Sequence, residues 1–243
     1  NGVINVTDAV LSGLRPFLKG RVIDVATGRG DFLRQVKALS TDLRLAVGVD
    51  NARRAAASWP SALGENGLAF ACADAGRLAL ASDAFDVVCI SNSLHHLADL
   101  EGTIAELLRV LTPGGALVVN EMVRDGQTET QQTHVLLHHW WAEIDTRSGV
   151  EHHPTYARAD LYALLRGLGL REAWSTEIND LSEDPHDPEA VRSLTEVCQV
   201  YPNKIQGHAD YDRLRERGAA LIERLNTVGF APATQILWAG IKS

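Results

Sequence analysis

The chain has 243 residues, of which 45% are hydrophobic, enough for one large α/β domain or two small ones. Its formal net charge of −8 argues against a nucleic-acid partner, which would need a broad basic face. We therefore expect a small-molecule substrate. No apolar stretch is long enough to cross a membrane, so we also expect no membrane insertion.

Apolar residues alternate along the chain between helix-like and strand-like spacing. A helical stripe over residues 7–18 predicts an N-terminal helix within 1–18. Strands are predicted near residues 21–26, 44–50, 68–73, 84–91 and 116–123, and later near 170–178 and 234–242. Helical faces lie between them, over 104–111 and 161–168. This order predicts an α/β fold with a seven-stranded, mostly parallel sheet and helices on both faces.

The turn after the first predicted strand is the most informative stretch. An apolar run ends in Asp24 and is followed by Gly28 and Gly30, which expose the backbone where a cofactor can lie against it. The dinucleotide-binding fingerprint has a third glycine, but this chain has Leu33 at that position. Asp31 would place a negative charge at the helix N-terminus, where phosphate would otherwise bind. The turn therefore favours a positively charged ligand over NAD.

The stretch resembles the first motif of class I S-adenosylmethionine-dependent methyltransferases, acid-x-Gly-x-Gly-x-Gly, with Ala26 in place of the first glycine. Four further segments resemble the family's later motifs, in the family's order: Val-Gly-Val-Asp at 47–50, Cys-Ala-Asp-Ala at 72–75, the strand at 85–92 and Leu-Thr-Pro-Gly-Gly at 111–115. Together they span residues 20–123, half of the chain. The resemblance implies a Rossmann-like sheet whose last strand runs antiparallel beside the fifth.

The resemblance also implies S-adenosylmethionine as the cofactor and assigns roles around it. Asp50 would accept hydrogen bonds from the ribose hydroxyls, and Asp74 would meet the adenine amino group. The two glycines would let the methionine part approach the backbone, and Asp24 would hold its ammonium. Both strand-end carboxylates could instead serve only as caps. The predicted cofactor residues are Asp24, Ala26, Thr27, Gly28, Gly30, Asp50, Asn51, Asp74, Ala75, Ser91 and Asn92.

Two histidines directly follow the fourth predicted strand, at the edge where cofactor and substrate would meet. A histidine can take a hydroxyl or amine proton near neutral pH. We predict His95, His96 and Glu121 as catalytic residues, with Glu121 orienting or assisting a histidine. The alternatives are that His95 caps the next helix, that His96 packs in the interior, and that transfer proceeds by proximity alone.

A single domain over 1–243 is predicted, with a cofactor-binding half at 19–123 and a C-terminal half at 157–243. Residues 124–156 exceed a minimal core and are predicted to form a helical lid, since insertions at the carboxyl edge of a parallel sheet lie beside the ligand crevice. Residues 180–230 form a second helical insertion, which could be lid, dimer contact or outer layer.

The predicted lid carries a second group of histidines, at positions 134, 138, 139, 152 and 153, beside Trp140 and Trp141. His134 and His138 share a helix face at a spacing that can bind a metal. No His-Glu-x-x-His pattern or cysteine pair accompanies them, so we expect no metal site. The tryptophans would either enclose an apolar substrate or pack in the interior.

Cys72 and Cys89 fall in strands that are predicted to be buried, and with Cys198 they indicate reduced cysteines in a cytoplasmic protein. The first seven residues lack the pattern of a secretory signal, which agrees with that location. A homodimer is left open.

The fourth strand ends in Ser-Asn-Ser-Leu, not in the Asn/Asp-Pro-Pro-aromatic pattern of many methyltransferases that act on nucleic-acid bases. The sequence Ser-Leu-His-His-Leu resembles the small-molecule group that includes quinone-biosynthesis C-methyltransferases. The leading interpretation is methyl transfer to O, N or C of a small molecule. The alternatives are an NAD(P)-dependent oxidoreductase and a non-catalytic S-adenosylmethionine-binding regulatory protein.

Overall fold

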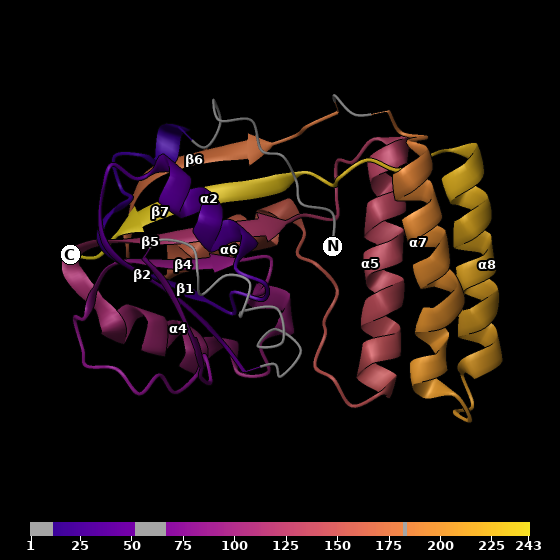
Figure 1. The fold of residues 1–243 in the computed structure, drawn as a ribbon, viewed down its shortest axis with the longest axis horizontal. Helices are drawn as coiled ribbons and strands as arrows, with labels where there is room; N and C mark the ends of the chain where they lie inside the picture. Colours follow the sequence, from indigo (N-terminus) through magenta and orange to yellow (C-terminus); the bar gives the residue numbers. More distant parts are fainter. Residues whose placement is uncertain (1–11, 52–66, 182–183) are drawn as a thin grey trace.

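A computed structural model describes residues 12–51, 67–181 and 184–243. Its seven strands form one sheet in the order β3-β2-β1-β4-β5-β7-β6 (Figure 1). The strands are β1 (Lys19–Val25), β2 (Asp42–Asp50), β3 (Leu68–Cys72), β4 (Phe85–Ser91), β5 (Leu111–Met122), β6 (Arg171–Ile178) and β7 (Gln235–Ile241). Neighbours from β3 to β5 pair in parallel, whereas β7 is antiparallel to both β5 and β6. The predicted mostly parallel sheet with an antiparallel last strand is confirmed.

Both faces of the sheet are covered, which explains why the central strands are nearly continuous apolar runs. Alternate residues of β1 face opposite sides: Val22 joins one hydrophobic cluster and Ile23 the other. Helix α2 (Asp31–Leu39) covers the first side, and helices α4 (Leu100–Val110) and α6 (Arg158–Gly167) cover the second. Helix α4 begins after Asp99, whose side chain accepts a hydrogen bond from the Gly102 N–H.

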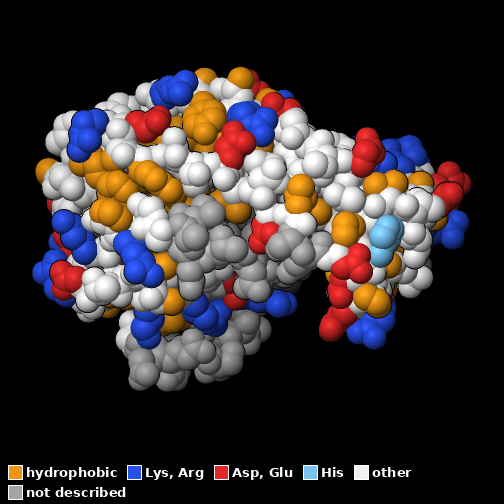
Figure 2. All heavy atoms as spheres, turned by 90° about the horizontal axis from the view of Figure 1, so that it is seen from above, with side chains coloured by type: hydrophobic (Ala, Val, Ile, Leu, Met, Phe, Trp, Pro, Cys, Tyr) orange, Lys and Arg blue, Asp and Glu red, His pale blue; other side chains and the backbone are white. Residues whose placement is uncertain are grey.

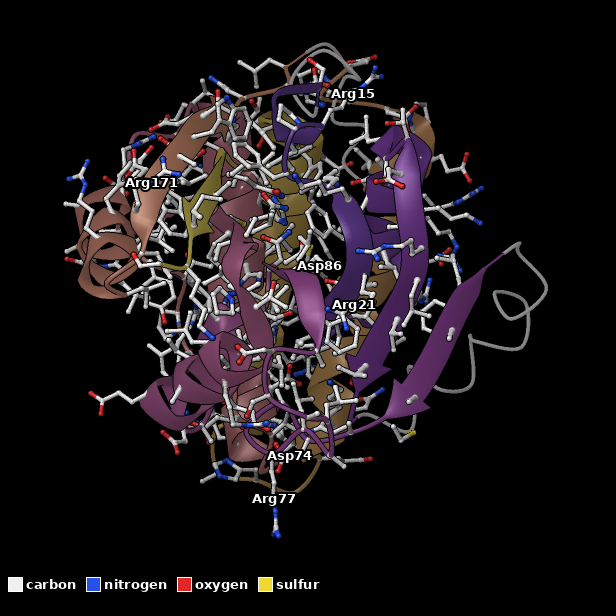
Figure 3. The ribbon with its side chains drawn as sticks, turned by 90° about the vertical axis from the view of Figure 1, so that its left-hand side faces the viewer. Arg15, Arg21, Asp74, Arg77, Asp86 and Arg171 are labelled. Carbon is white, nitrogen blue, oxygen red and sulfur yellow. The ribbon has the colours of Figure 1, made fainter. Side chains whose placement is uncertain are left out.

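An ion pair joins the starts of β1 and β4, at the amino edge of the sheet. Arg21 donates its backbone N–H to Asp86 at 2.8 Å, and its guanidinium lies 3.3 Å from the same oxygen (Figure 3). Arg44 on β2 adds a second contact at 3.1 Å. Although partial burial alone would raise it, these cations hold the pKa of Asp86 below its ordinary value.

Helices α5 (Glu129–Arg147), α7 (Pro188–Val200) and α8 (Tyr211–Thr227) lie side by side as a bundle beyond the carboxyl edge of the parallel strands (Figure 1). In Figure 2 this bundle projects from the body that contains the sheet. It has a hydrophobic cluster of its own, in which Trp140 is fully buried and donates its indole N–H to the Leu214 carbonyl at 2.8 Å. The two segments predicted as insertions therefore pack on each other, and Trp140 is an interior packing residue.

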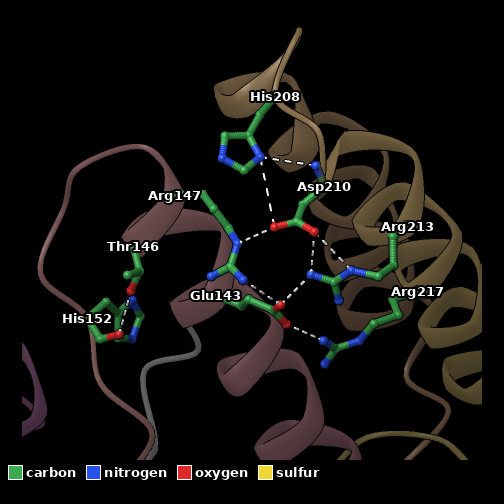
Figure 4. A network of polar contacts seen from close by, with 8 residues as sticks. All are labelled: Glu143, Thr146, Arg147, His152, His208, Asp210, Arg213 and Arg217. Carbon is green, nitrogen blue, oxygen red and sulfur yellow. Dashed lines mark hydrogen bonds and ion pairs between the residues drawn. The ribbon is translucent and has the colours of Figure 1, made fainter.

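A network of ions also ties α5 to the start of α8 (Figure 4). Glu143 lies 2.6 Å from Arg213 and also contacts Arg217, while Asp210 lies 2.6 Å from Arg147. Each pair is partly exposed and would contribute little alone, but together they fix how the two helices face each other.

Three expectations differ from the structure. Residues 1–11 of the predicted N-terminal helix lie outside the described residues, and the described part holds a short 3₁₀ helix (Ser12–Leu14) rather than an α-helix. Cys72 is exposed, because it ends the edge strand β3, whereas Cys89 is buried in central β4 as expected. Strand β5 starts at Leu111, before Pro113 and Gly114, because Leu111 pairs with Phe85 across an irregularity in the register.

No helix among the described residues combines the length and the apolar character needed to span a membrane.

Trp140→Ala should lower the free energy of unfolding by about 3–5 kcal/mol, because it leaves a large cavity in the bundle core. Val200→Ala is the matched control: Val200 is 59% exposed on α7, and its truncation should change stability by no more than about 0.5 kcal/mol. Urea denaturation followed by circular dichroism measures both. Equal effects of the two substitutions would contradict the packing described here.

Candidate functional site

The turn between β1 and α2 is built from left-handed residues. Ala26, Gly28 and Gly30 have φ angles of 56°, 55° and 83°. A Cβ at position 30 would lie 2.6 Å from the Phe70 ring, so glycine is required there. A Cβ at position 28 would meet no described atom within 4 Å, so the backbone is open on the side where a ligand could approach.

Ala26 stands where the methyltransferase motif has glycine. Its left-handed conformation costs a non-glycine residue about 1–2 kcal/mol, so the turn holds it under local strain. Its carbonyl accepts a hydrogen bond from the Ser93 hydroxyl at 3.3 Å. That contact brings the turn after β4 against the turn after β1.

Asp50, at the end of β2, connects two of the predicted cofactor loops. Its side chain accepts the Gly28 N–H at 2.9 Å, and its backbone carbonyl accepts the Ala73 N–H at 3.1 Å. The loop after β3 is thereby held beside the glycine turn. Asn51 follows Asp50 and is exposed.

Asp24 is buried beneath the same turn. One of its oxygens accepts a hydrogen bond from the Thr27 hydroxyl at 2.6 Å, and the other has no hydrogen-bond partner among the described residues. Burial raises the pKa of Asp24 to about 7; the Thr27 hydrogen bond lowers it, and the nearby negative charge of Asp50 raises it. An unpartnered buried carboxylate oxygen suits the ammonium group of an amino-acid ligand.

The remaining predicted cofactor residues lie in the turns after β3 and β4. Asp74 is exposed, accepts the Gly76 N–H at 2.9 Å and forms an isolated bridge with Arg77, which lies on the same turn in Figure 3. Ala75 and Ser91 are half-buried. Asn92 is left-handed, with φ of 47°, and donates its N–H to the Asn120 carbonyl at 2.7 Å. The four turns thus form one contiguous edge.

Glu121 fixes the turn that carries the two predicted catalytic histidines. This buried carboxylate on β5 accepts the Leu94 N–H at 2.9 Å and lies 2.7 Å from Nδ1 of His95. His95 is itself buried, and its Nε2 has no hydrogen-bond partner among the described residues. The next helix, α4, is capped by Asp99 and not by His95. His96 is exposed rather than interior.

Two histidines of the predicted lid join this turn. Nitrogens of His95, His96, His138 and His152 lie within 4.8 Å of one another. His138 comes from α5, and His152 comes from the loop that follows it. That loop is held against the sheet because the His153 N–H donates to the His95 carbonyl at 2.8 Å.

The other lid histidines have partners elsewhere. His134 accepts the Ala233 N–H at 2.9 Å, His139 lies 3.0 Å from the Thr155 hydroxyl, and His153 is exposed beside Glu151. Sequence spacing singled out His134 with His138, but only His138 reaches the cluster. No sequence signal linked it to His95, because the contact depends on how α5 packs beyond the sheet.

Comparison with known proteins agrees with the fold. Residues 23–119 match the family model of a methyltransferase domain. The chain is 31% identical over 122 residues to a demethylmenaquinone methyltransferase of Bacteroides fragilis, covering 46% of this chain and 47% of that protein. It is 35% identical over 131 residues to the ubiquinone/menaquinone biosynthesis C-methyltransferase UbiE of Ectopseudomonas mendocina, covering 48% and 46%. The chain spans about half the length of the curated relatives that it matches.

Solved structures share the fold at low sequence identity. An S-adenosylmethionine-dependent methyltransferase from Mesorhizobium loti has a TM-score of 0.53 at 18% identity, covering 96% of each chain. The [4+2]-cyclase SpnF has a TM-score of 0.57 at 18% identity, covering 96% of this chain and 78% of that one. The shared fold therefore does not define the reaction by itself.

The sheet order, the motif turns and the matched family model together define a class I S-adenosylmethionine-dependent methyltransferase domain. Within the matched half, the chain is similar to the UbiE-like methyltransferases, whose methyl donor is S-adenosylmethionine. The antiparallel β7 also departs from the dinucleotide-binding sheet, which is parallel at that edge.

Asp50→Ala should weaken S-adenosylmethionine binding by about a hundredfold or more, because two hydrogen bonds to a charged acceptor are worth roughly 1.5–3 kcal/mol each. Asp42→Ala, at the exposed start of the same strand, is the control and should bind normally. Isothermal titration calorimetry gives both affinities. Unchanged affinity in folded Asp50→Ala would contradict the assigned role.

Asp24→Asn should stabilise the ligand-free protein more at pH 8 than at pH 5. The folded pKa of about 7 exceeds the ordinary aspartate value of 3.8, so the folded state retains a proton that the unfolded chain releases. Wild-type stability therefore falls as pH rises through this window, and the variant escapes that loss. The gap should widen by about 2–3 kcal/mol between pH 5 and pH 8. A gap that is independent of pH in thermal unfolding would show that Asp24 is already ionised in the folded state.

Proposed function

We propose that the chain is an S-adenosylmethionine-dependent methyltransferase that acts on a small-molecule acceptor. The observation that carries the proposal is the contiguous edge of four turns, in which Asp50 holds both the glycine turn and the loop after β3. Asp24 supplies the unpartnered buried oxygen expected of an ammonium site. The printed functions of the relatives make a quinone-type ring carbon the first acceptor to test, with O and N acceptors next.

The bundle gives the acceptor site an aromatic side. Trp141 on α5 is half-buried, its indole N–H has no hydrogen-bond partner among the described residues, and its ring lies 6.3 Å from that of His138. A planar acceptor could pack against the exposed part of this ring. This placement supports the lid role of residues 124–156.

Two further features bear on the setting of the enzyme. The three cysteines are free, which favours the reducing cytoplasm. On the face drawn in Figure 2, basic and acidic side chains lie side by side, which favours a small molecule over a nucleic acid.

The experiment combines binding and turnover. Calorimetric titration with S-adenosylmethionine, S-adenosylhomocysteine and NADH should give binding of the first two only. Incubation with S-adenosylmethionine and a panel of hydroquinones, phenols and amines should then release S-adenosylhomocysteine. NADH binding would favour the oxidoreductase alternative. Cofactor binding without turnover on any acceptor would favour the regulatory alternative.

We propose that His95 is the general base that removes a proton from the substrate and that Glu121 positions its ring. His96 is the second candidate for the base. Nδ1 of His95 faces Glu121, so Nε2 is the nitrogen that can take a proton, and in this structure it is buried among the neighbouring histidines. Methyl transfer needs such a base for a weakly acidic hydroxyl but not for a neutral amine or a carboxylate.

His95→Ala should lower kcat by about 10²–10⁴ and leave the affinity for S-adenosylmethionine nearly unchanged. His96→Ala tests the second candidate, and His153→Ala, an exposed neighbour, is the control. Steady-state kinetics on the identified acceptor would measure all three. Full turnover in both His95→Ala and His96→Ala would mean that the enzyme works by alignment alone.

A further inference from the structure

The four-histidine cluster joins three separate parts of the fold. His95 and His96 lie on the 3₁₀ turn after β4 (Leu94–His96), His138 on α5, and His152 on the loop between α5 and α6. One nitrogen from each lies within 4.8 Å of the others. His95 and His152 are buried, His138 is half-buried, and His96 forms the exposed end of the group. Such convergence of imidazoles needs a physical reason.

The outward nitrogens of the buried histidines are already held by carboxylates. Nδ1 of His95 lies 2.7 Å from Glu121, and Nδ1 of His152 lies 2.9 Å from Asp145. Because a carboxylate accepts hydrogen bonds, each Nδ1 carries the proton, and each Nε2 presents a lone pair. Neither Nε2 has a hydrogen-bond partner among the described residues, and the same is true of Nδ1 of His138.

Asp145 is well suited to this supporting role. Besides His152, it accepts hydrogen bonds from the Lys204 ammonium at 2.6 Å and from the Tyr201 hydroxyl at 2.9 Å. These donors hold the carboxylate in place, and its oxygen keeps the proton of His152 on Nδ1.

Neutral imidazoles whose lone pairs converge are the donor set of a transition-metal site, and carboxylates behind them are the usual outer partners of metal-bound histidine.

We propose that His95, His96, His138 and His152 bind one divalent transition-metal ion, and that the ion is zinc. Zinc–nitrogen bonds of about 2.0–2.1 Å in a tetrahedron place the nitrogens about 3.3 Å apart. The cluster is wider than this at 4.8 Å, so binding draws the rings inward by up to about 1.5 Å. The proposal does not depend on the proposed methyl transfer.

Four protein ligands fill a tetrahedral shell, which is the arrangement of structural zinc sites. The ion would cross-link α5 to the turn after β4, three residues beyond the end of that strand, and so fix the bundle beside the cofactor edge. It would also occupy the Nε2 lone pair of His95. His95 is then a ligand in the zinc-loaded protein, so its proposed role as proton acceptor, and the loss of turnover expected for His95→Ala, apply to the zinc-free protein.

The test is metal binding by the purified full chain after treatment with a chelator. After dialysis against zinc, elemental analysis should find about one zinc per chain, and zinc should raise the melting temperature. Cobalt(II) in place of zinc should give the intense visible absorption of a tetrahedral site. Zinc affinity is measured by competition with a chromophoric chelator.

His138→Ala and His152→Ala should each abolish stoichiometric zinc binding and the cobalt absorption. His153→Ala is the matched control, because this exposed neighbour of His152 lies outside the cluster, and it should bind as the wild type does. Asp145→Asn should weaken zinc binding by about 10–100-fold through the loss of the outer partner. Circular dichroism checks that each variant is folded; His138 makes no side-chain hydrogen bond through Nδ1, so its removal should be tolerated.

Substoichiometric zinc in the wild type would overturn the proposal. Zinc binding at wild-type level in folded His138→Ala and His152→Ala would also overturn the proposal, since the ion would then be held elsewhere. The same holds if His153→Ala loses zinc binding to the same extent as these two variants.

Discussion

Parallel pairing of β1 with β2 and β4 is the constraint on which the site depends, because it brings the carboxyl ends of these strands to one edge. The turn that leaves each end must satisfy backbone groups that the sheet no longer pairs. Asp50 accepts an N–H from the turn after β1 through its side chain and one from the turn after β3 through its carbonyl. Ser93, in the turn after β4, donates a hydrogen bond to Ala26 in the turn after β1. The same contacts leave the Gly28 backbone open to a ligand.

Two carboxyl groups of this edge region show how partners decide the effect of burial. Asp24 has a single hydroxyl donor, so burial prevails and its pKa rises to about 7. Asp145 is bonded by an ammonium, a hydroxyl and an imidazole, and its pKa falls to about 2. The first is poised to gain a cationic partner from a ligand. The second keeps a permanent charge behind His152.

The helical bundle affects both the turn after β4 and the histidine cluster. Its helices come from segments far apart in the chain, yet they share one hydrophobic cluster around Trp140. Helix α5 places His138 beside His95 on the turn after β4, so the packing of the bundle determines the surroundings of His95. A change in this packing would alter the histidine cluster and, through it, the turn after β4.

The sheet and the cofactor turns could be predicted from the sequence because their signals are local. Apolar periodicity marks the strands, and a strand-end acid followed by Gly28 and Gly30 marks the turn. The antiparallel β7 was predictable only through the family resemblance. The strain at Ala26 was not, because a φ angle of 56° leaves no trace in composition.

The histidine cluster could not be predicted for a different reason. Its members lie on three segments with no ligand spacing in common, and only the packing of α5 and the loop after it brings them together. Because the sequence contains no recognised metal-ligand motif around these histidines, it led us to expect no metal site. The exposure of Cys72 was missed likewise, because an apolar run does not tell an edge strand from a central one.

The central claim is that the cofactor lies along the edge formed by the turns after β1, β2, β3 and β4. Hydrogen–deuterium exchange with and without S-adenosylhomocysteine tests it most directly, because it locates the ligand without a known acceptor. We expect slower exchange in residues 26–31, 50–51, 73–76 and 91–96, with the β6–β7 edge unchanged. Protection confined to the α7–α8 part of the bundle, or no protection at saturating ligand, would contradict it.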